Sequence, residues 1–169
     1  NIPANGPFII APNHESFLDA PMVTSGLSWD TIRNTYFYAT EEHFNTAFKR
    51  SVAHGSNVIL MQKSDLKSSI QYMAQALRAG KNLMIFPEGR RTNTGEMGDF
   101  KKTFAILAKE LRVPIVPVRI TGAFEALPRH KSFPRPSKVT VEYLPAVMPD
   151  VTKSYDEIAE QVKKIIARD

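Results

Sequence analysis

Short apolar runs alternate with longer amphipathic stretches along the chain, and this alternation predicts strands separated by helices. Apolar runs of four to six residues, typical of strands, occur at 8–11, 35–40, 57–61, 83–86, 115–120 and 139–143. Helices are expected from near residue 19 to 26 and over 41–52, 65–79, 100–111 and 155–167. Such alternation is typical of a parallel sheet covered on both faces. We therefore expect a single α/β domain over residues 1–169, with a largely parallel mixed β-sheet flanked by helices on both faces.

The helix expected over 65–79 has the clearest pattern, and other segments carry breakers. Gly80 supplies its stop signal. Pro117 predicts an edge strand or a bulge, because proline lacks the N–H that a central strand uses. Residues 92–98 hold two glycines and predict a mobile loop, and residues 128–136 form a basic excursion with three prolines. The apolar residues that recur at three- and four-residue spacing in the clearest helix are Leu66, Ile70, Met73 and Leu77.

Composition narrows the class of partner and of chemistry. The chain has 169 residues and a net charge of +5, which favours a phosphate ester, an anionic lipid surface or nucleic acid, although an ordinary mixed surface has the same balance. There is no cysteine, so disulfides, thiol nucleophiles and cysteine metal sites are excluded. No apolar run approaches the roughly 20 residues of a membrane-spanning helix. Residues 1–6 are polar and turn-like, which predicts a domain excised from a longer protein, with any membrane anchor outside this chain.

The first candidate for chemistry is the pair of His14 and Asp19, which follows the run 8–11. Taken singly, His14 fits a structural side chain or a turn former, and Asp19 fits a helix N-cap or a Ser16-x-x-Asp19 capping arrangement. Taken together, a turn can fold the carboxylate back to one imidazole nitrogen, which leaves the other nitrogen to accept a proton. Because no Gly-x-Ser-x-Gly nucleophile is present, the pair would activate a hydroxyl of the substrate.

The second candidate is the segment from Pro87 to Arg91, which follows the run 83–86. Pro87 ends the strand and Gly89 permits a tight turn, which holds Glu88 at the sheet edge to accept from a hydroxyl. Arg90 and Arg91 can fork around phosphate oxygens, although solvated arginines in a turn are the simpler alternative.

No metal site is predicted from the histidines. His14-Glu15 lacks the second histidine of a His-Glu-x-x-His motif. The other histidines have no metal-ligand spacing and are interpreted as surface or core side chains: His43, His54 and His130.

Three blocks, in order, resemble the glycerolipid acyltransferases of the lysophosphatidic acid (1-acylglycerol-3-phosphate) acyltransferase type. They are His14-x4-Asp19, the block Phe86-Pro87-Glu88-Gly89, and the run Val-Pro-Ile-Val-Pro-Val at 113–118, and the resemblance covers nearly the whole chain. It implies that His14 is the catalytic base and that Asp19 orients it. It also implies that Phe86, Pro87, Glu88 and Gly89 help to bind the acyl acceptor, with Arg90 and Arg91 nearest its phosphate.

A fourth block of this family is thought to contact the same phosphate and corresponds here to residues 57–63. Lys63 stands where arginine is usual, so the charge is kept and the bidentate fork is lost. Asn57 stands where glycine is usual, and Arg90 where a small hydroxyl residue is commoner. These departures leave the identity of the acceptor open. Family members fused to acyl-activating enzymes look similar to this variant.

The resemblance implies an O-acyltransferase of phospholipid biosynthesis or remodelling. It would move a fatty acyl group from acyl-CoA or acyl-ACP to the free hydroxyl of a lysophospholipid, with the thioester as a substrate and no bound cofactor or metal. The expected location is the cytoplasmic side of a membrane, either peripheral or anchored by segments outside this chain. Besides the two substrates, the expected partners are a membrane surface and an acyl carrier protein or fused acyl-activating domain; nucleic acid is not expected.

Three alternatives stay open at this point. A non-catalytic lipid-binding module would bind lysophospholipid without turnover and would keep binding when His14 is lost. An acyltransferase for another acceptor would use glycerol phosphate or an amino-acid lipid. A basic nucleic-acid-binding domain would show steeply salt-dependent affinity, but none of the familiar nucleic-acid signatures is present.

Overall fold

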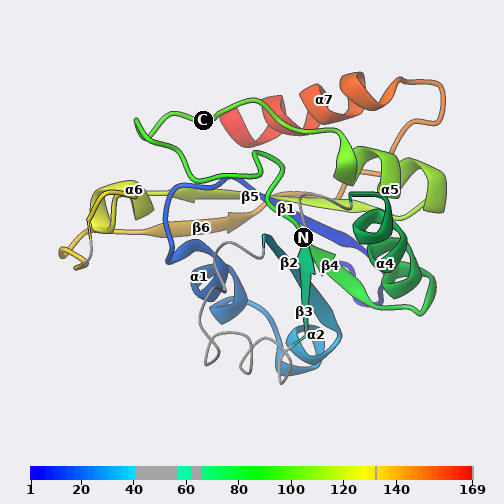
Figure 1. Ribbon diagram of the computed structural model, residues 1–169, viewed down its shortest axis with the longest axis horizontal. Helices are drawn as coiled ribbons and strands as arrows, with labels where there is room; N and C mark the ends of the chain where they lie inside the picture. Colours follow the sequence, from blue (N-terminus) through cyan, green and yellow to red (C-terminus); the bar gives the residue numbers. More distant parts are fainter. Residues whose placement is uncertain (41–56, 62–65, 132, 169) are drawn as a thin grey trace.

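The computed structural model describes residues 1–40, 57–61, 66–131 and 133–168, which form one sheet with helices packed on it (Figure 1). The strands are β1 (Ile9–Pro12), β2 (Thr35–Thr40), β3 (Val58–Met61), β4 (Asn82–Met84), β5 (Ile115–Thr121) and β6 (Thr140–Tyr143). The helices are α1 (Asp19–Ser25), α2 (Trp29–Arg33), α4 (Leu66–Arg78), α5 (Thr103–Leu111), α6 (Ala123–Ala126) and α7 (Tyr155–Ala167).

The sheet is mixed and largely parallel, as predicted. Its strand order is β3-β2-β4-β1-β5-β6, and β6 runs antiparallel to β5 while the other pairs are parallel. Ile9 of β1 lies opposite Leu83 of β4 on one side and opposite Ile115 of β5 on the other. The carboxyl ends of β4, β1 and β5 therefore meet at one edge of the sheet, which is where ligands bind in open α/β sheets.

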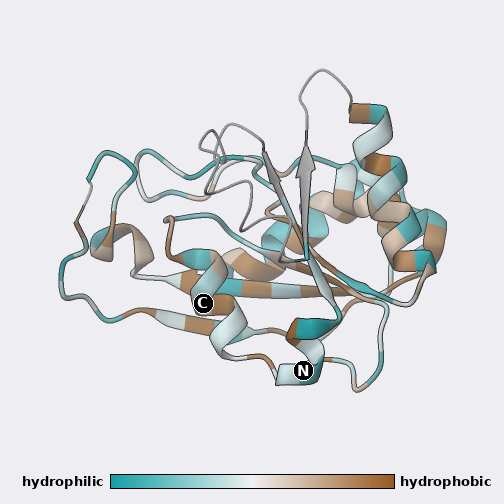
Figure 2. Ribbon diagram, turned by 60° about the horizontal axis from the view of Figure 1, so that its bottom comes forward, coloured by the Kyte–Doolittle hydropathy of each residue, from teal (hydrophilic) through white to brown (hydrophobic). Residues whose placement is uncertain are grey.

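Alternate residues of the central strands face two different layers of helices. Ile9 and Leu83 pack with buried residues of α4, α5 and α7, whereas Phe8, Ile10 and Met84 pack on the other side with residues of α1 and α2. Both faces of the sheet are covered, as predicted (Figure 1). In Figure 2 the strands that cross the centre carry brown hydrophobic segments, and the connecting loops are mostly teal or white.

Two short helices are not predicted by the sequence pattern. In α2 the N-cap Ser28 accepts from the backbone N–H of Thr31, and five residues are too few to show a hydrophobic period. α6 has four residues, and its first two N–H groups donate to the carboxylate of Glu15. The residue that caps this helix is therefore distant in sequence, and no local pattern predicts the helix. The other helices of the described part appear where expected, with small shifts at their ends; α5 begins at Thr103 instead of residue 100.

Pro117 lies in an interior strand, so its predicted edge position is wrong. β5 runs between β1 and β6. The carbonyl of Pro117 accepts from the N–H of Leu144, in the segment that follows β6. The N–H that proline lacks would therefore point toward this segment and not toward β1. There Val118 lies opposite Tyr143, but Ile115 lies opposite Val147. The partner segment therefore has one more residue than β5 between these two pairs, as in a β-bulge. A bulge is the other arrangement that the sequence predicted for Pro117.

Some predictions are not tested by the described residues. The helix expected over 41–52 lies outside them, as do Lys63, His43 and His54. Residues 92–98 form a turn in which Oγ1 of Thr92 accepts from the N–H groups of Thr94 and Gly95. The mobility of this loop stays a prediction.

Candidate active site

The histidine and aspartate that the sequence pairs are in hydrogen-bond contact. Nδ1 of His14 lies 2.8 Å from Oδ2 of Asp19, whose side chain is fully buried, while 17% of the His14 side chain is exposed. β1 ends at Pro12 and α1 begins at Asp19, so the turn between them folds the carboxylate back to the ring, as predicted. Because Nδ1 faces a carboxylate, its protonated tautomer is favoured and Nε2 is left as the basic nitrogen.

Asp19 also holds the turn itself. Its Oδ2 accepts from the backbone N–H groups of Glu15 at 2.6 Å and Ser16 at 2.8 Å, while Oδ1 is buried without a hydrogen-bond partner among the described residues. The N-cap of α1 is Leu18, and the Ser16 hydroxyl donates to the carbonyl of Leu127. Asp19 is therefore not the N-cap. Of the Ser16-x-x-Asp19 arrangement one half forms, because Asp19 accepts from the Ser16 N–H, whereas the N–H of Asp19 donates to the Ser16 carbonyl instead of its hydroxyl. Asp19 is the first residue of α1, where the helix dipole favours a negative charge.

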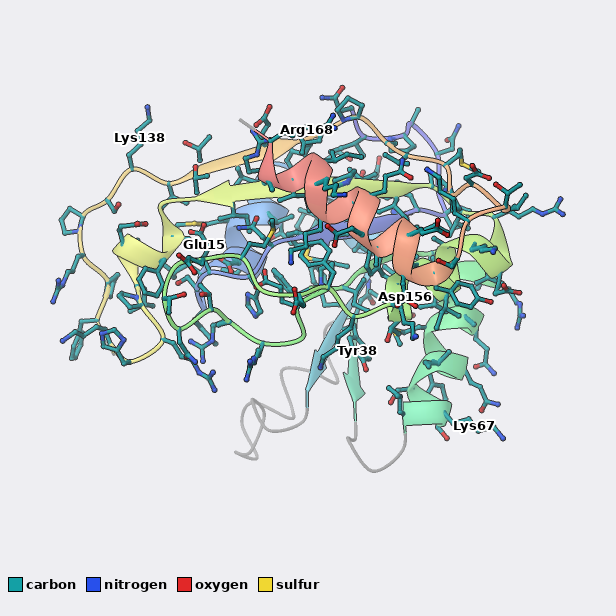
Figure 3. The ribbon with its side chains drawn as sticks, turned by 90° about the horizontal axis from the view of Figure 1, so that it is seen from above. Glu15, Tyr38, Lys67, Lys138, Asp156 and Arg168 are labelled. Atoms are coloured by element: carbon teal, nitrogen blue, oxygen red, sulfur yellow. The ribbon has the colours of Figure 1, made fainter. Side chains whose placement is uncertain are left out.

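The two neighbours of His14 tie this turn to β5 and α6. The Asn13 amide donates to the carbonyl of Ile120 at 2.9 Å and accepts from its N–H at 2.7 Å, so it continues the ladder between β1 and β5. Oε2 of Glu15 accepts from the N–H groups of Ala123 at 2.9 Å and Phe124 at 3.0 Å, and Figure 3 shows Glu15 beside this short yellow helix. The sequence predicts neither role, because the partners lie more than 100 residues away.

The second motif lies directly against the first. Glu88 is buried, and its Oε1 and Oε2 accept from the backbone N–H groups of His14 at 2.7 Å and Gly98 at 2.8 Å. The Phe86 ring stacks on the His14 imidazole with the ring centroids 4.0 Å apart, and Pro87 is buried in the same turn. The resemblance implies acceptor binding for these residues. In the structure, Glu88 and Phe86 support the candidate base, and both carboxylate oxygens of Glu88 already have backbone donors.

The predicted cations of this motif differ in their surroundings. Gly89 makes the tight turn that the sequence predicts, with φ +68° and its N–H donated to the carbonyl of Phe86 at 3.0 Å. Arg90 is exposed and makes no hydrogen bond or ion pair within the described ranges. Arg91 is half-buried and lies near enough to Asp19 and Arg129 for their charges to act on it. Arg129 comes from the basic excursion 128–136 and is not predicted as a site residue.

Burial shifts the pKa of three charged groups around this turn. It raises the pKa of Glu15 to about 6 and also raises the pKa of Glu88, in each case against the effect of backbone hydrogen bonds. Burial lowers the pKa of Arg91, as does the positive charge of Arg129, while Asp19 acts in the opposite direction. Several perturbed groups gathered at one sheet edge are typical of a functional site.

A cavity of about 160 Å³ opens beside His14 and Glu88, between the loop 92–97, the end of β5 and the end of α7. Pockets that enclose a small ligand have about 300–1,000 Å³, so this cavity by itself cannot enclose a fatty acyl chain. In the described part of the chain, no three His, Asp or Glu side chains are placed to share a metal ion.

Known proteins similar in sequence and fold are acyltransferases. Residues 1–121 match the family model described as Acyltransferase. The chain is 36% identical over 111 residues to a 1-acyl-sn-glycerol-3-phosphate acyltransferase of Limnanthes alba, covering 63% of this chain and 39% of that protein. It is 26% identical over 145 residues to the 1-acyl-sn-glycerol-3-phosphate acyltransferase beta of Homo sapiens, covering 83% and 51%.

The fold is similar to a solved structure of the same class. The crystal structure of the 1-acyl-sn-glycerophosphate (LPA) acyltransferase PlsC from Thermotoga maritima superposes with a TM-score of 0.84 at 25% identity. The match covers 98% of this chain and 66% of that one. The chain thus spans 39% of the length of the Limnanthes alba relative and about two thirds of the PlsC chain.

Proposed function

Because the chain belongs to the acyltransferase family, we propose that it transfers a fatty acyl group from an acyl thioester to the free hydroxyl of a lysophospholipid such as 1-acylglycerol 3-phosphate. The relatives named above support this class of acceptor. The observation that carries the proposal is the 2.8 Å contact between His14 and Asp19, with the Arg91 guanidinium nearby. A base oriented by a buried carboxylate suits activation of a hydroxyl, and a cation beside it suits a phosphorylated acceptor.

In the proposed mechanism Nε2 of His14 takes the proton of the acceptor hydroxyl as that oxygen attacks the thioester carbonyl carbon. The carbon–sulfur bond then breaks, and the departing sulfur takes the proton back from the imidazolium. Asp19 stabilises the imidazolium through Nδ1. Glu88 and Phe86 hold the base in place, which keeps the reacting atoms at high effective concentration.

The donor is proposed to be acyl-CoA or acyl-ACP, since both present the same thioester. It enters as a substrate, and the steps above need neither a bound cofactor nor a metal ion. A lysophospholipid acceptor places the activity in phospholipid biosynthesis or remodelling. An acyl carrier protein or a fused acyl-activating domain would be the partner that delivers the donor.

We further propose that the site works at a membrane surface on its cytoplasmic side. Phe17 and Phe133 are 65% and 83% exposed, and they lie in loops that follow β1 and α6 at the edge that carries His14. Exposed aromatic side chains beside basic residues are typical of surfaces that contact anionic lipid. None of the helices in the described ranges is long and apolar enough to cross a bilayer. We propose that this contact is peripheral or depends on an anchor outside this chain.

The decisive experiment is transfer from a radiolabelled acyl-CoA or acyl-ACP to a panel of acceptors, followed by lipid chromatography. We expect His14→Ala to abolish transfer while the protein stays folded. His130→Ala is the matched control, because it removes an exposed imidazole that has no hydrogen bond to His14 or Asp19 in the described part of the chain. Wild-type turnover by folded His14→Ala protein would contradict the mechanism. Lysophospholipid binding without turnover by the wild type would identify a lipid-binding module instead.

A further inference from the structure

The segment that follows α6 begins next to the candidate catalytic turn. The Ser16 hydroxyl donates to the carbonyl of Leu127 at 2.9 Å, and the backbone N–H of Arg135 closes the segment by donating to the carbonyl of Ala126 at 2.7 Å. Arg129 is exposed two residues beyond Leu127, whereas the side chain of Lys138, three residues after Arg135, projects away from the fold (Figure 3). The segment lies beyond residues 1–121, so the family match assigns it no role.

Arg91 approaches the same turn from the loop after β4. The next residue, Thr92, donates its backbone N–H to the carbonyl of His14 at 2.9 Å. The residue after that, Asn93, accepts from Nη1 of Arg129 at 3.4 Å. Arg91 and Arg129 are therefore attached through near neighbours to positions 14 and 16 of one turn, and Asn93 connects their two loops.

These two guanidinium groups carry positive charge that the described residues do not neutralise. Neither forms an ion pair with a carboxylate of the described part. The charge of Arg129 lowers the pKa of Arg91, and Asp19, the carboxylate that opposes this effect, already binds His14. Like charges held together are unfavourable until an anion joins them. A phosphate monoester carries about −1.5 to −2 at neutral pH, which matches two guanidinium groups.

We propose that Arg129 joins Arg91 in a clamp for the phosphate monoester of the acyl acceptor, so that the segment after α6 determines headgroup specificity. The inference rests on the proposed function and names the acceptor class of that same site. Guanidinium forks bind phosphate oxygens in pairs, and a monoester offers three such oxygens. A diester headgroup carries a single negative charge and fewer free oxygens, so the clamp selects against it.

The test compares Arg129→Gln with Arg135→Gln. The two variants lose the same charge from exposed positions on the same segment, but within the described ranges Arg135 makes only a backbone hydrogen bond, to the carbonyl of Ala126. We expect Arg129→Gln to raise KM for 1-acylglycerol 3-phosphate at least about tenfold, with kcat and the KM for 1-monoacylglycerol within about twofold. Arg129→Lys should be intermediate, because it keeps the charge and loses the fork. Equal KM values for the phosphorylated acceptor in both glutamine variants would overturn the clamp.

A binding measurement separates failure of the clamp from failure of the proposed function. Equilibrium binding of 1-acylglycerol 3-phosphate is measured without a thioester donor on the wild type and both glutamine variants. Loss of affinity in Arg129→Gln alone supports the clamp even if no donor gives turnover. Equal binding by all three proteins refutes the clamp even if the wild type is an active acyltransferase.

Discussion

The carboxylate of Glu88 accepts a 2.7 Å hydrogen bond from the backbone N–H of His14, across 74 residues of sequence. The two charged motifs of the chain are therefore one structural unit, in which the second holds the main chain of the first. Phe86 adds a ring stacked on the imidazole from the same segment. The position of the candidate base is thus set from outside its own turn, which makes that position sensitive to changes in the supporting residues.

Replacing Glu88 tests whether it positions the base or contacts the acceptor. In Glu88→Gln a single carbonyl oxygen replaces the two carboxylate oxygens that accept from the N–H groups of His14 and Gly98. One of these two N–H groups would then face the NH₂ group of the amide and lose its acceptor. We expect the free energy of unfolding to fall by about 1–3 kcal/mol. We also expect kcat to fall while KM for the acceptor stays within about twofold, the pattern of a lost transition-state interaction.

The control for Glu88→Gln is Glu160→Gln, an exposed change on α7 that does not line the cavity and should leave both quantities nearly unchanged. Urea unfolding and steady-state kinetics check both variants. An increase in KM at constant kcat would show that Glu88 contacts the acceptor, as the resemblance implies.

Asp19→Asn is expected to separate the structural and electrostatic roles of Asp19. The amide oxygen can still accept from the backbone N–H groups of Glu15 and Ser16, but the neutral side chain no longer stabilises an imidazolium. We predict a fall in kcat of about 10²–10⁴-fold with KM nearly unchanged. Circular dichroism and kcat against pH are the measurements. Wild-type kcat in the folded variant would leave Asp19 with a structural role alone.

The stability of the protein should depend on the ionisation of Glu15. Burial raises the pKa of Glu15 from 4.5 to about 6, so between these values the folded state binds more protons than the unfolded state. The free energy of unfolding therefore falls as pH rises through this window, by about 1–2 kcal/mol for this group. The contribution is present below pH 4.5 and is lost above about pH 6.

Glu15→Gln removes this titration and leaves the other ionisable groups in place. The measured quantity is the unfolding free energy of the wild type minus that of the variant, at pH 4.5 and at pH 7. Taking the difference cancels shared titrations, including that of Glu88. A difference that does not change with pH would contradict the raised pKa.

Two glycines with similar backbone angles offer a matched test of close packing. Gly122 has φ +84° and a Cβ there would overlap the carbonyl oxygen of Lys138, whereas Gly80 has φ +77° and open space around it. Gly80→Ala should lower the free energy of unfolding by about 1–2 kcal/mol from backbone strain alone. Gly122→Ala should lower the free energy of unfolding by at least about 1 kcal/mol more than Gly80→Ala, because the backbone at Lys138 must move to admit the methyl group. Equal losses in urea unfolding would show that the approach to Lys138 is not tight.

Local sequence pattern was enough to predict most described elements and one contact of the site. Periodicity belongs to consecutive residues, so α4 and α7 were predicted with ends that differ little from those observed. The contact between His14 and Asp19 was predictable for the same reason, since both residues belong to one short turn. α6 and the interior position of Pro117 were not predicted correctly, because each depends on a partner that the local pattern does not contain.

Local pattern along the chain predicts most of the described strands and helices, with α2 and α6 as exceptions, and it places an imidazole and a carboxylate in the turn after β1. The tertiary structure decided what surrounds that pair: Glu88 on one side, Ile120 and α6 on the other, and Arg129 beside Arg91. The physical reason is the strand order, which places β1 between β4 and β5 and so brings three distant chain segments to one edge. Spacing along the chain contains no information about that order, which the packing of the whole sheet selects.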